Sequence, residues 1–264
     1  MTDTGRIVAV TGASSGIGLA AARLFRDRGD KVYCLSRTDP KEPGITFIHT
    51  DVTDEASVNA AFGAIGKAEG RIDVLLSNAG IGVSGAAECT TMQDAKRQLD
   101  VNFFGLHACV RAAVPLMRAH GGTILATSSV AAVFAIPFQA FYSASKFAVN
   151  ALVLALANEL KPFNIRVAAI MPGDVKTGFT GARVKAARDD NYGQSVEKSV
   201  AVMEHDEQNG MWPEMIAKRF VALSLKKHPK VLSTVGLQYK FFCFLGKVLP
   251  IRLQNFIVGK MYIK

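Results

Sequence analysis

Short apolar runs alternate with longer amphipathic stretches along most of the chain. Runs rich in Val, Ile and Leu have the length of buried strands and cover residues 6–10, 31–35, 45–49, 72–76, 123–127 and 165–170. Helical spacing of apolar positions predicts helices over 19–28, 54–67, 91–118 and 141–160. Strands that alternate with helices indicate βαβ units. We therefore expect an α/β fold, a single Rossmann-like doubly wound parallel sheet with helices on both faces.

One segment departs from this pattern. Residues 174–212 are polar and weakly periodic, with scattered glycines, and lie between a strand end and a helix that Pro213 is expected to start. A long stretch of this kind without regular structure is often a lid or a binding loop. We predict one domain over 1–264 with a substrate lid at 174–212, and a plain surface insertion is the alternative.

The net charge of +9 is confined to the end of the chain. The chain carries 31 basic and 22 acidic side chains, and the segment after Glu214 holds ten basic residues and no acidic one. Residues 1–214 therefore hold 21 basic against 22 acidic side chains. A near-neutral body with a basic tail does not indicate a nucleic-acid-binding protein.

The basic tail is also apolar. Residues 238–264 form two apolar segments, separated by Pro250 and interrupted only by basic charges. This pattern suits peripheral contact with an anionic membrane surface. It equally suits a segment that covers the protein's own substrate cleft or a subunit contact. Both interpretations predict a lipophilic substrate.

The remaining composition indicates a cytoplasmic protein. The N-terminus lacks the basic and apolar regions of a signal peptide, and no run of 18 or more uncharged apolar residues predicts a membrane-spanning helix. The four cysteines and five histidines lack the spacing of a disulfide framework or a metal site. We expect reduced thiols, no metal, and a membrane-surface location only if the tail provides it.

A glycine-rich turn follows the first predicted strand. In Thr11-Gly-Ala-Ser-Ser-Gly-Ile-Gly18 the glycines let the backbone approach a pyrophosphate, and the helix N-terminus supplies free N–H groups. The second strand ends in Leu35-Ser-Arg37, without the acidic residue that binds the ribose hydroxyls of NAD. Arg37 can bind a 2′-phosphate, which favours NADP(H). A solvated surface arginine is the alternative.

Seven motifs in order, over about residues 6–180, resemble the short-chain dehydrogenase/reductase family. After the glycine-rich turn come Asp51-Val52, Asn78-Ala-Gly80, Asn102 in Val101-Asn-Phe-Phe-Gly105, Ser128-Ser129, Tyr142-Ser-Ala-Ser-Lys146 and Pro172-Gly-Asp-Val-Lys-Thr177. A less specific likeness, from Ser129 to Phe179, is to the 17β-hydroxysteroid and retinol dehydrogenase branch. Ser77 and Ala168 depart from the family pattern without removing a catalytic group.

The resemblance implies both a catalytic set and a cofactor site. The catalytic residues would be Asn102, Ser129, Tyr142 and Lys146. The cofactor-binding residues would be Gly12, Ser14, Ser15, Gly16, Ile17, Gly18, Arg37, Asp51, Val52, Asn78, Ala79, Gly80, Tyr142, Lys146, Pro172, Gly173, Val175 and Thr177. Among these, Ser14 and Arg37 resemble the 2′-phosphate pair of NADP-using members.

The spacing of Tyr142 and Lys146 places both on one face of a helix. A free tyrosine has a pKa near 10, and we expect the Lys146 ammonium and an oxidised nicotinamide to lower it. Tyr142 would then exchange the proton, Ser129 would hold the substrate oxygen, and Asn102 would anchor a water that connects Lys146 to solvent.

These residues predict an NADP(H)-dependent oxidoreductase that interconverts a ketone and a secondary alcohol on a lipophilic, hydroxysteroid-like substrate. Alternatives are a reductase of fatty, sphingoid or general carbonyl compounds, and a non-catalytic NADP(H)-binding sensor. By position, Phe134, Phe138, Phe179, Met211 and Trp212 are expected to line the substrate pocket. The two long helices resemble those of the family's four-helix contacts, which implies a homodimer or homotetramer.

Overall fold

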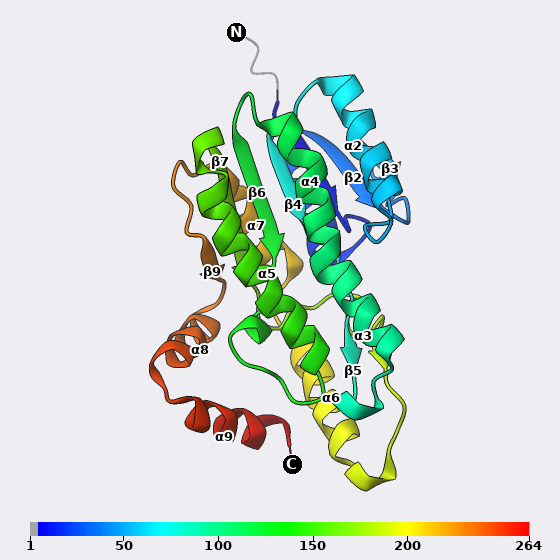
Figure 1. The fold of residues 1–264 in the computed structure, drawn as a ribbon, viewed down its shortest axis with the longest axis vertical. Helices are drawn as coiled ribbons and strands as arrows, with labels where there is room; N and C mark the ends of the chain where they lie inside the picture. The colour runs from blue at the N-terminus through cyan, green and yellow to red at the C-terminus, as the bar shows by residue number, and fades with distance from the viewer. Residues whose placement is uncertain (1–4, 264) are drawn as a thin grey trace.

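A parallel sheet of seven strands forms the centre of the computed structural model, which describes residues 5–263 (Figure 1). Met1–Thr4 and the tail residue Lys264 lie outside the described residues. The spatial order is β3-β2-β1-β4-β6-β7-β9. The strands are β1 (Ile7–Thr11), β2 (Lys31–Ser36), β3 (Ile45–His49), β4 (Val74–Ser77), β6 (Gly122–Thr127), β7 (Ile165–Met171) and β9 (Leu232–Thr234).

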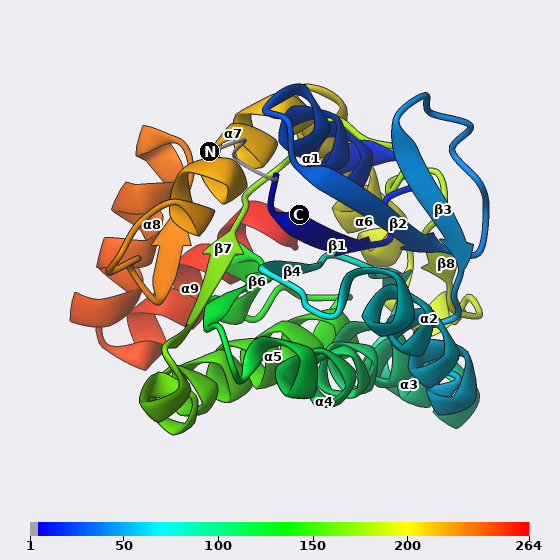
Figure 2. The same ribbon diagram turned by 90° about the horizontal axis from the view of Figure 1, so that it is seen from above.

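Helices cover both faces of this sheet (Figure 2). One layer contains α2 (Glu55–Glu69), α4 (Gly105–Met117) and α5 (Ala140–Glu159), and the other contains α1 (Gly16–Asp27) and α7 (Pro213–Ser224). Strands buried on both faces need apolar residues at successive positions, and all five residues of β1 are buried. The predicted fold class is confirmed.

Several helix ends follow the expected local signals. The Asp54 side chain accepts a hydrogen bond from the Ala56 N–H at the start of α2, and Pro213 is the first residue of α7. The Thr91 side chain caps α3 (Met92–Leu99). The long helix predicted over 91–118 is interrupted, however, by a π-helical turn, η2 (Asp100–Phe104), between α3 and α4. A π-helical turn contains one residue more than an α-helical turn, and the spacing of apolar residues along the sequence does not reveal that difference.

The segment 174–212 is more regular than predicted. It contains β8 (Val184–Lys185), the 3₁₀ turn η5 (Asp190–Tyr192) and the 14-residue helix α6 (Ser195–Gln208), so the expectation of a stretch without regular structure was wrong. The helix buries only Ser199, Val200 and Met203, too few apolar positions to give a clear pattern. The short strand β5 (Val83–Ser84) pairs with β8 in a separate two-stranded sheet.

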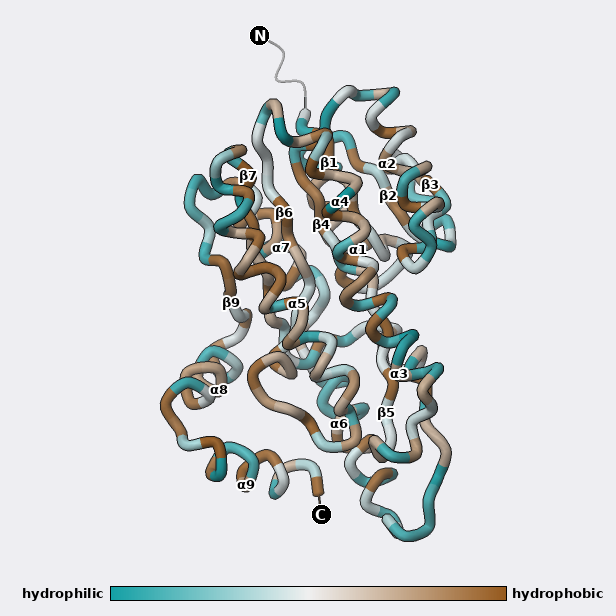
Figure 3. Tube along the Cα trace, viewed as in Figure 1, coloured by the Kyte–Doolittle hydropathy of each residue, from teal (hydrophilic) through white to brown (hydrophobic). Residues whose placement is uncertain are grey.

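The tail forms two helices, α8 (Leu237–Val248) and α9 (Ile251–Tyr262), as Pro250 between them suggests. The Gln254 amide nitrogen donates hydrogen bonds to the Gly246 and Leu249 carbonyls, at 3.1 and 2.7 Å, and so fastens the start of α9 to the end of α8. Figure 3 shows hydrophobic and hydrophilic positions mixed along both helices.

Among the described residues one helix, α5, is long and apolar enough to cross a membrane by length and composition alone. That helix packs against β7 and the 3₁₀ turn η3 (Val130–Ala132), and it carries the buried Lys146. Seven of its residues, Lys146 among them, are buried, so its place in the core explains part of its apolar character.

Candidate active site

A cavity of about 1190 Å³ opens at the carboxyl ends of the parallel strands. Nearly every residue of the predicted cofactor and catalytic sets lines it. The two exceptions are Gly18, which packs beneath the glycine-rich turn, and Asn102, which lies behind the residues that line the cavity. The fold thus brings together seven motifs from separate parts of the chain.

Close backbone packing explains the glycines of the turn. Gly12 has φ +62°, and a Cβ there would lie 2.7 Å from the Ala79 Cα atom. A Cβ on Gly18 would lie 2.3 Å from the Gly12 carbonyl oxygen. Larger residues would force the turn away from the strand ends, so the narrow cradle needs glycine at both positions.

The start of α1 suits a pyrophosphate. Ser15 precedes the helix, its side chain makes no capping hydrogen bond, and no acidic residue occurs in the first turn. The first N–H groups of α1 therefore remain available to an anion beside the cavity. Thr177 lies close by, because a Cβ on Gly16 would be 3.3 Å from the Thr177 Cγ2 atom.

Arg37 and Asp51 line the cavity where the sequence predicts the adenosine of a dinucleotide. Arg37 is exposed, and within residues 5–263 its guanidinium has no hydrogen-bond or ion-pair partner, so it is free to bind a phosphate. Partial burial raises the pKa of Asp51, but hydrogen bonds from Thr53 and the charge of Arg37 outweigh burial and hold that pKa below its usual value. Asp51 is thus an ionised acceptor for donors of an adenine or ribose.

A hydrogen-bonded floor connects three strand ends. The Thr11 hydroxyl accepts from the Asn78 N–H at 3.0 Å, the Asn78 amide donates to the Gly12 carbonyl at 3.2 Å, and the Thr127 hydroxyl donates to Asn78 Oδ1 at 2.9 Å. These bonds fix Asn78 below the glycine-rich turn. Thr11 and Thr127 act here as supports that the motif comparison did not single out.

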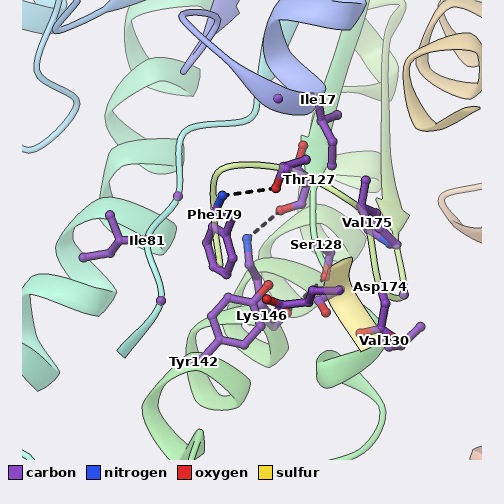
Figure 4. A pocket seen from close by; sticks show the side chains of 18 of the residues that line it. Ile17, Ile81, Thr127, Ser128, Val130, Tyr142, Lys146, Asp174, Val175 and Phe179 are labelled. Carbon is purple, nitrogen blue, oxygen red and sulfur yellow. Dashed lines mark hydrogen bonds between the residues drawn. The ribbon is translucent and has the colours of Figure 1, made fainter. Parts of the chain in front are cut away.

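Lys146 projects from α5 into the cavity and is 4% exposed. Its Nζ atom donates to the Thr127 carbonyl at 2.8 Å, which Figure 4 marks with the dashed line that starts at the Lys146 nitrogen. Burial lowers the pKa of Lys146 to about 8, because the ammonium has lost most of its hydration. The group is therefore held in place and close to its titration point at neutral pH.

Tyr142 lies beside Lys146, whose Nζ atom is 5.7 Å from the centre of the phenol ring (Figure 4). Burial raises the pKa of Tyr142 to about 12; the Ser129 hydroxyl and Arg183 oppose that rise, and the Glu207 and Asp174 carboxylates add to it. The lowering of this pKa that we expect from Lys146 together with an oxidised nicotinamide stays a prediction. The protein itself keeps Tyr142 a neutral phenol.

The π-helical turn η2 aims Asn102 inward. The Asn102 amide accepts from the Ile81 N–H at 2.9 Å and donates to the Ile81 carbonyl and the Ser145 hydroxyl, at 3.1 and 3.0 Å. Asn102 is 3% exposed and braces the strand-end loop against α5. Its side chain is thus occupied by protein groups, so its predicted water-anchoring role stays a prediction.

Ser129 follows β6 and starts η3. Its hydroxyl accepts from the Ala131 N–H at 3.1 Å and lines the cavity next to Tyr142. An oxygen that approaches Tyr142 would therefore meet two hydroxyl groups. Such a pair can hold a carbonyl oxygen and deliver a proton to it.

The far end of the cavity is apolar on one side and acidic on the other. Phe134, Phe179 and Met211 line it as predicted, but Phe138 and Trp212 do not. Phe138 packs against the Tyr192 ring, and Trp212 is exposed beneath the Lys176 ammonium. The acidic side consists of Asp174, Asp206 and Glu207.

The tail supplies lining residues that motif reasoning missed. They are Gln238, Tyr239, Phe242, Leu245 and Leu249 of the α8 region, and Gln254, Ile257, Val258, Met261 and Tyr262 of α9. The Tyr239 hydroxyl donates to the Asp174 carboxylate at 2.7 Å and accepts from the Asp174 N–H at 3.1 Å. A Cβ on Gly173 would lie 2.0 Å from the Tyr239 ring. The tail therefore covers the cleft and contacts the Pro172-Gly173 motif.

Comparison with known proteins decides the family. The model of the short chain dehydrogenase family matches residues 6–188. The chain belongs to the short-chain dehydrogenase family. It is accordingly an oxidoreductase that acts on CH–OH groups, with a fold that binds NAD or NADP.

Two relatives are similar over much of their length. A 3-ketodihydrosphingosine reductase of Bacteroides thetaiotaomicron is 38% identical over 236 residues, 88% of each chain. Mouse 17-beta-hydroxysteroid dehydrogenase type 1 is 38% identical over 191 residues, 66% of this chain and 55% of the relative.

Two solved structures share the fold. A short-chain dehydrogenase from Streptomyces avermitilis superimposes with a TM-score of 0.86 and 27% identity, covering 98% of both chains. An alcohol dehydrogenase from Thermococcus sibiricus, complexed with 5-hydroxy-NADP, has a TM-score of 0.72 and 25% identity, covering 87% of this chain and 95% of that one.

Proposed function

We propose that this enzyme reduces a ketone on a lipophilic substrate, with NADP(H) as the cofactor and with Asn102, Ser129, Tyr142 and Lys146 as its catalytic set. The observation that carries the proposal is one continuous cavity. It extends from the glycine-rich turn, past Ser129 and Tyr142, to the apolar inner faces of α8 and α9. A substrate in that cavity would have its reacting carbon between the cofactor end and an apolar wall.

In the reductive direction Tyr142 donates the proton. A neutral phenol with a pKa raised to about 12 is the form that can donate a proton to a carbonyl oxygen. When bound, NADPH supplies the hydride. The Ser129 hydroxyl orients the carbonyl, and the Lys146 ammonium, which donates to the Thr127 carbonyl, would bind hydroxyl groups of the cofactor ribose.

Arg37 supports NADP(H) over NAD(H). Its guanidinium has no ion-pair partner among residues 5–263, and both Arg37 and Ser14 of the turn line the cavity. A 2′-phosphate would gain two charge-assisted hydrogen bonds there.

A second candidate substrate is a sphingoid ketone, which carries a long alkyl chain and an amino group. Asp174, Asp206 and Glu207 line the cavity, and the carboxylates of Asp174 and Glu207 are close enough to influence Tyr142. An ammonium group next to the reacting ketone would be attracted by Asp174 and Asp206, whereas Glu207 already pairs with the Arg183 guanidinium. The Bacteroides thetaiotaomicron relative is named for such a ketone.

Oxidation of NADPH and of NADH, measured with a panel of substrates, tests the proposal. The panel contains a 17-ketosteroid, a retinoid, a long-chain 2-amino ketone and a small water-soluble ketone. We expect NADPH turnover with at least one lipophilic ketone at a kcat/KM about 100-fold above that for the small ketone. Equal rates across the panel would contradict the lipophilic substrate class.

The proposal includes a homodimer or homotetramer and a cytoplasmic location at a membrane surface. Phe104 of η2 and Phe147 and Leu154 of α5 are exposed on the helices expected to form the subunit contact. Sedimentation of a Phe147→Glu variant tests the contact, and a shift toward the monomer is the expected result.

A further inference from the structure

The two tail helices have apolar residues on both faces. On α8, the inward residues Tyr239, Phe242 and Leu245 line the cavity. The outward apolar residues are Leu237, Phe241, Phe244 and Val248, and all four are exposed. A helix with an apolar face on each side normally lies between two apolar surroundings. The body of the protein supplies only one of them.

The second helix repeats this arrangement. Val258 of α9 lines the cavity and is buried, Met261 lines the cavity and is also exposed, and Ile251, Leu253 and Phe256 are exposed without lining it. Because Gln254 fastens α9 to the end of α8, the two helices hold their outward residues as one unit. We name these seven exposed apolar residues of α8 and α9 the outer face. Figures 1 and 2 show both helices at one side of the molecule, beyond β9.

The charges beside the outer face all have one sign. Lys240 and Lys247 on α8, and Arg252 and Lys260 on α9, are exposed, and neither helix contains an acidic residue. A second copy of this face would bring like charges together, which opposes self-association. An anionic lipid bilayer matches both features, because its headgroups attract the basic side chains and its acyl region accepts the apolar ones.

From this charge complementarity we infer that the outer face binds an anionic bilayer, and that α8 and α9 lie between the bilayer and the substrate cavity. The inference rests on the proposed function, because it adds a route by which a lipophilic ketone enters the cavity from the lipid. It combines the two interpretations of the tail, because the inner faces would cover the cleft while the outer face contacts the membrane.

Co-sedimentation of the full-length protein with vesicles tests the inference. We expect binding to vesicles of phosphatidylcholine mixed with phosphatidylglycerol, and much weaker binding to phosphatidylcholine alone. The Phe244→Ser/Phe256→Ser variant should bind the anionic vesicles at least about tenfold more weakly, because it loses two inserted rings. The Lys240→Gln/Lys247→Gln variant should lose about thirtyfold in affinity.

A matched control changes the same kinds of residue elsewhere. Met92 and Lys96 are exposed on α3, away from the tail in Figure 1, and the Met92→Ser/Lys96→Gln variant should bind vesicles like the wild type. Binding of NADPH, measured by fluorescence, checks that each variant is folded. Failure of the wild type to bind anionic vesicles, or equal binding by the Phe244→Ser/Phe256→Ser variant, overturns the inference.

Two further measurements separate this inference from the proposed function. Turnover of a water-soluble ketone should be unchanged in the outer-face variants, whereas turnover of a vesicle-embedded ketone should fall with vesicle binding. Vesicle binding without ketone turnover would contradict the proposed function alone. Concentration-dependent association that disappears in the Phe244→Ser/Phe256→Ser variant, without vesicle binding, would assign the outer face to a second copy and overturn the inference.

Discussion

The cofactor end and the tail end of the cavity are built in different ways. At the cofactor end, backbone turns and buried side chains hold one another, as when Asn78 bonds to Thr11, Gly12 and Thr127. At the tail end, two helices with apolar residues on both faces form a cover, joined to the body by contacts such as Tyr239 with Asp174. Rigid packing at one end suits an invariant cofactor, and an apolar cover suits a lipophilic substrate.

The largest effect is expected at the rigid end, from removal of the proton donor. Tyr142→Phe should lower kcat about 1000-fold, because a positioned acid contributes 100- to 10,000-fold. NADPH binding, followed by fluorescence, should change little. The matched control Tyr33→Phe removes a hydroxyl that bonds to Glu69, far from the cavity, and should keep its activity. Wild-type turnover in Tyr142→Phe would remove Tyr142 from the catalytic set.

The second largest effect is expected on the preference for NADPH over NADH. Arg37→Ala should raise the KM for NADPH about 30-fold and leave the KM for NADH nearly unchanged, because only the 2′-phosphate loses its partner. Steady-state kinetics with both cofactors measure this difference. Arg28→Ala, at the exposed end of α1, is the control. An equal rise in the KM for NADPH and the KM for NADH would mean that Arg37 does not bind the 2′-phosphate.

The buried lysine predicts a pH dependence. With its pKa lowered to about 8, Lys146 is charged below that pH and loses its proton above it. The kcat/KM for reduction should therefore be level below about pH 8 and fall about tenfold per unit above it, since Tyr142 stays protonated up to about pH 12. Lys146→Arg keeps its charge and should lack this descending limb. If kcat/KM still falls above pH 8 in the Lys146→Arg variant, the decrease belongs to another titratable group.

The smallest effect is expected at the cover. Leu249→Ser, on the inner face, should raise the KM for a lipophilic ketone about fivefold in detergent solution, because one apolar contact is lost. The KM for a small ketone should stay the same. Val248→Ser changes the neighbouring exposed residue and serves as the control. Equal responses of Leu249→Ser and Val248→Ser would show that the inner face does not contact the substrate.

Local signals predicted the frame of the fold well. Six of the seven strands in the main sheet, the Asp54 cap and the Pro213 helix start follow from apolar runs and capping chemistry. The helix α6 and the π-helical turn η2 were missed. Tertiary contacts stabilise α6 despite a weak pattern, and the π-helical turn depends on the bonds that Asn102 makes to Ile81 and Ser145.

The sequence by itself determined the family, the glycine-rich cradle and the motif residues that meet at the cofactor end of the cleft, because close backbone packing and buried hydrogen bonds tolerate few residue types. Only the tertiary structure decided the rest. Burial, which no sequence window reports, raises the pKa of Tyr142 to about 12 and lowers the pKa of Lys146 to about 8. Likewise, only docking of the tail divides its apolar residues into a face that lines the cavity and a face left for a partner.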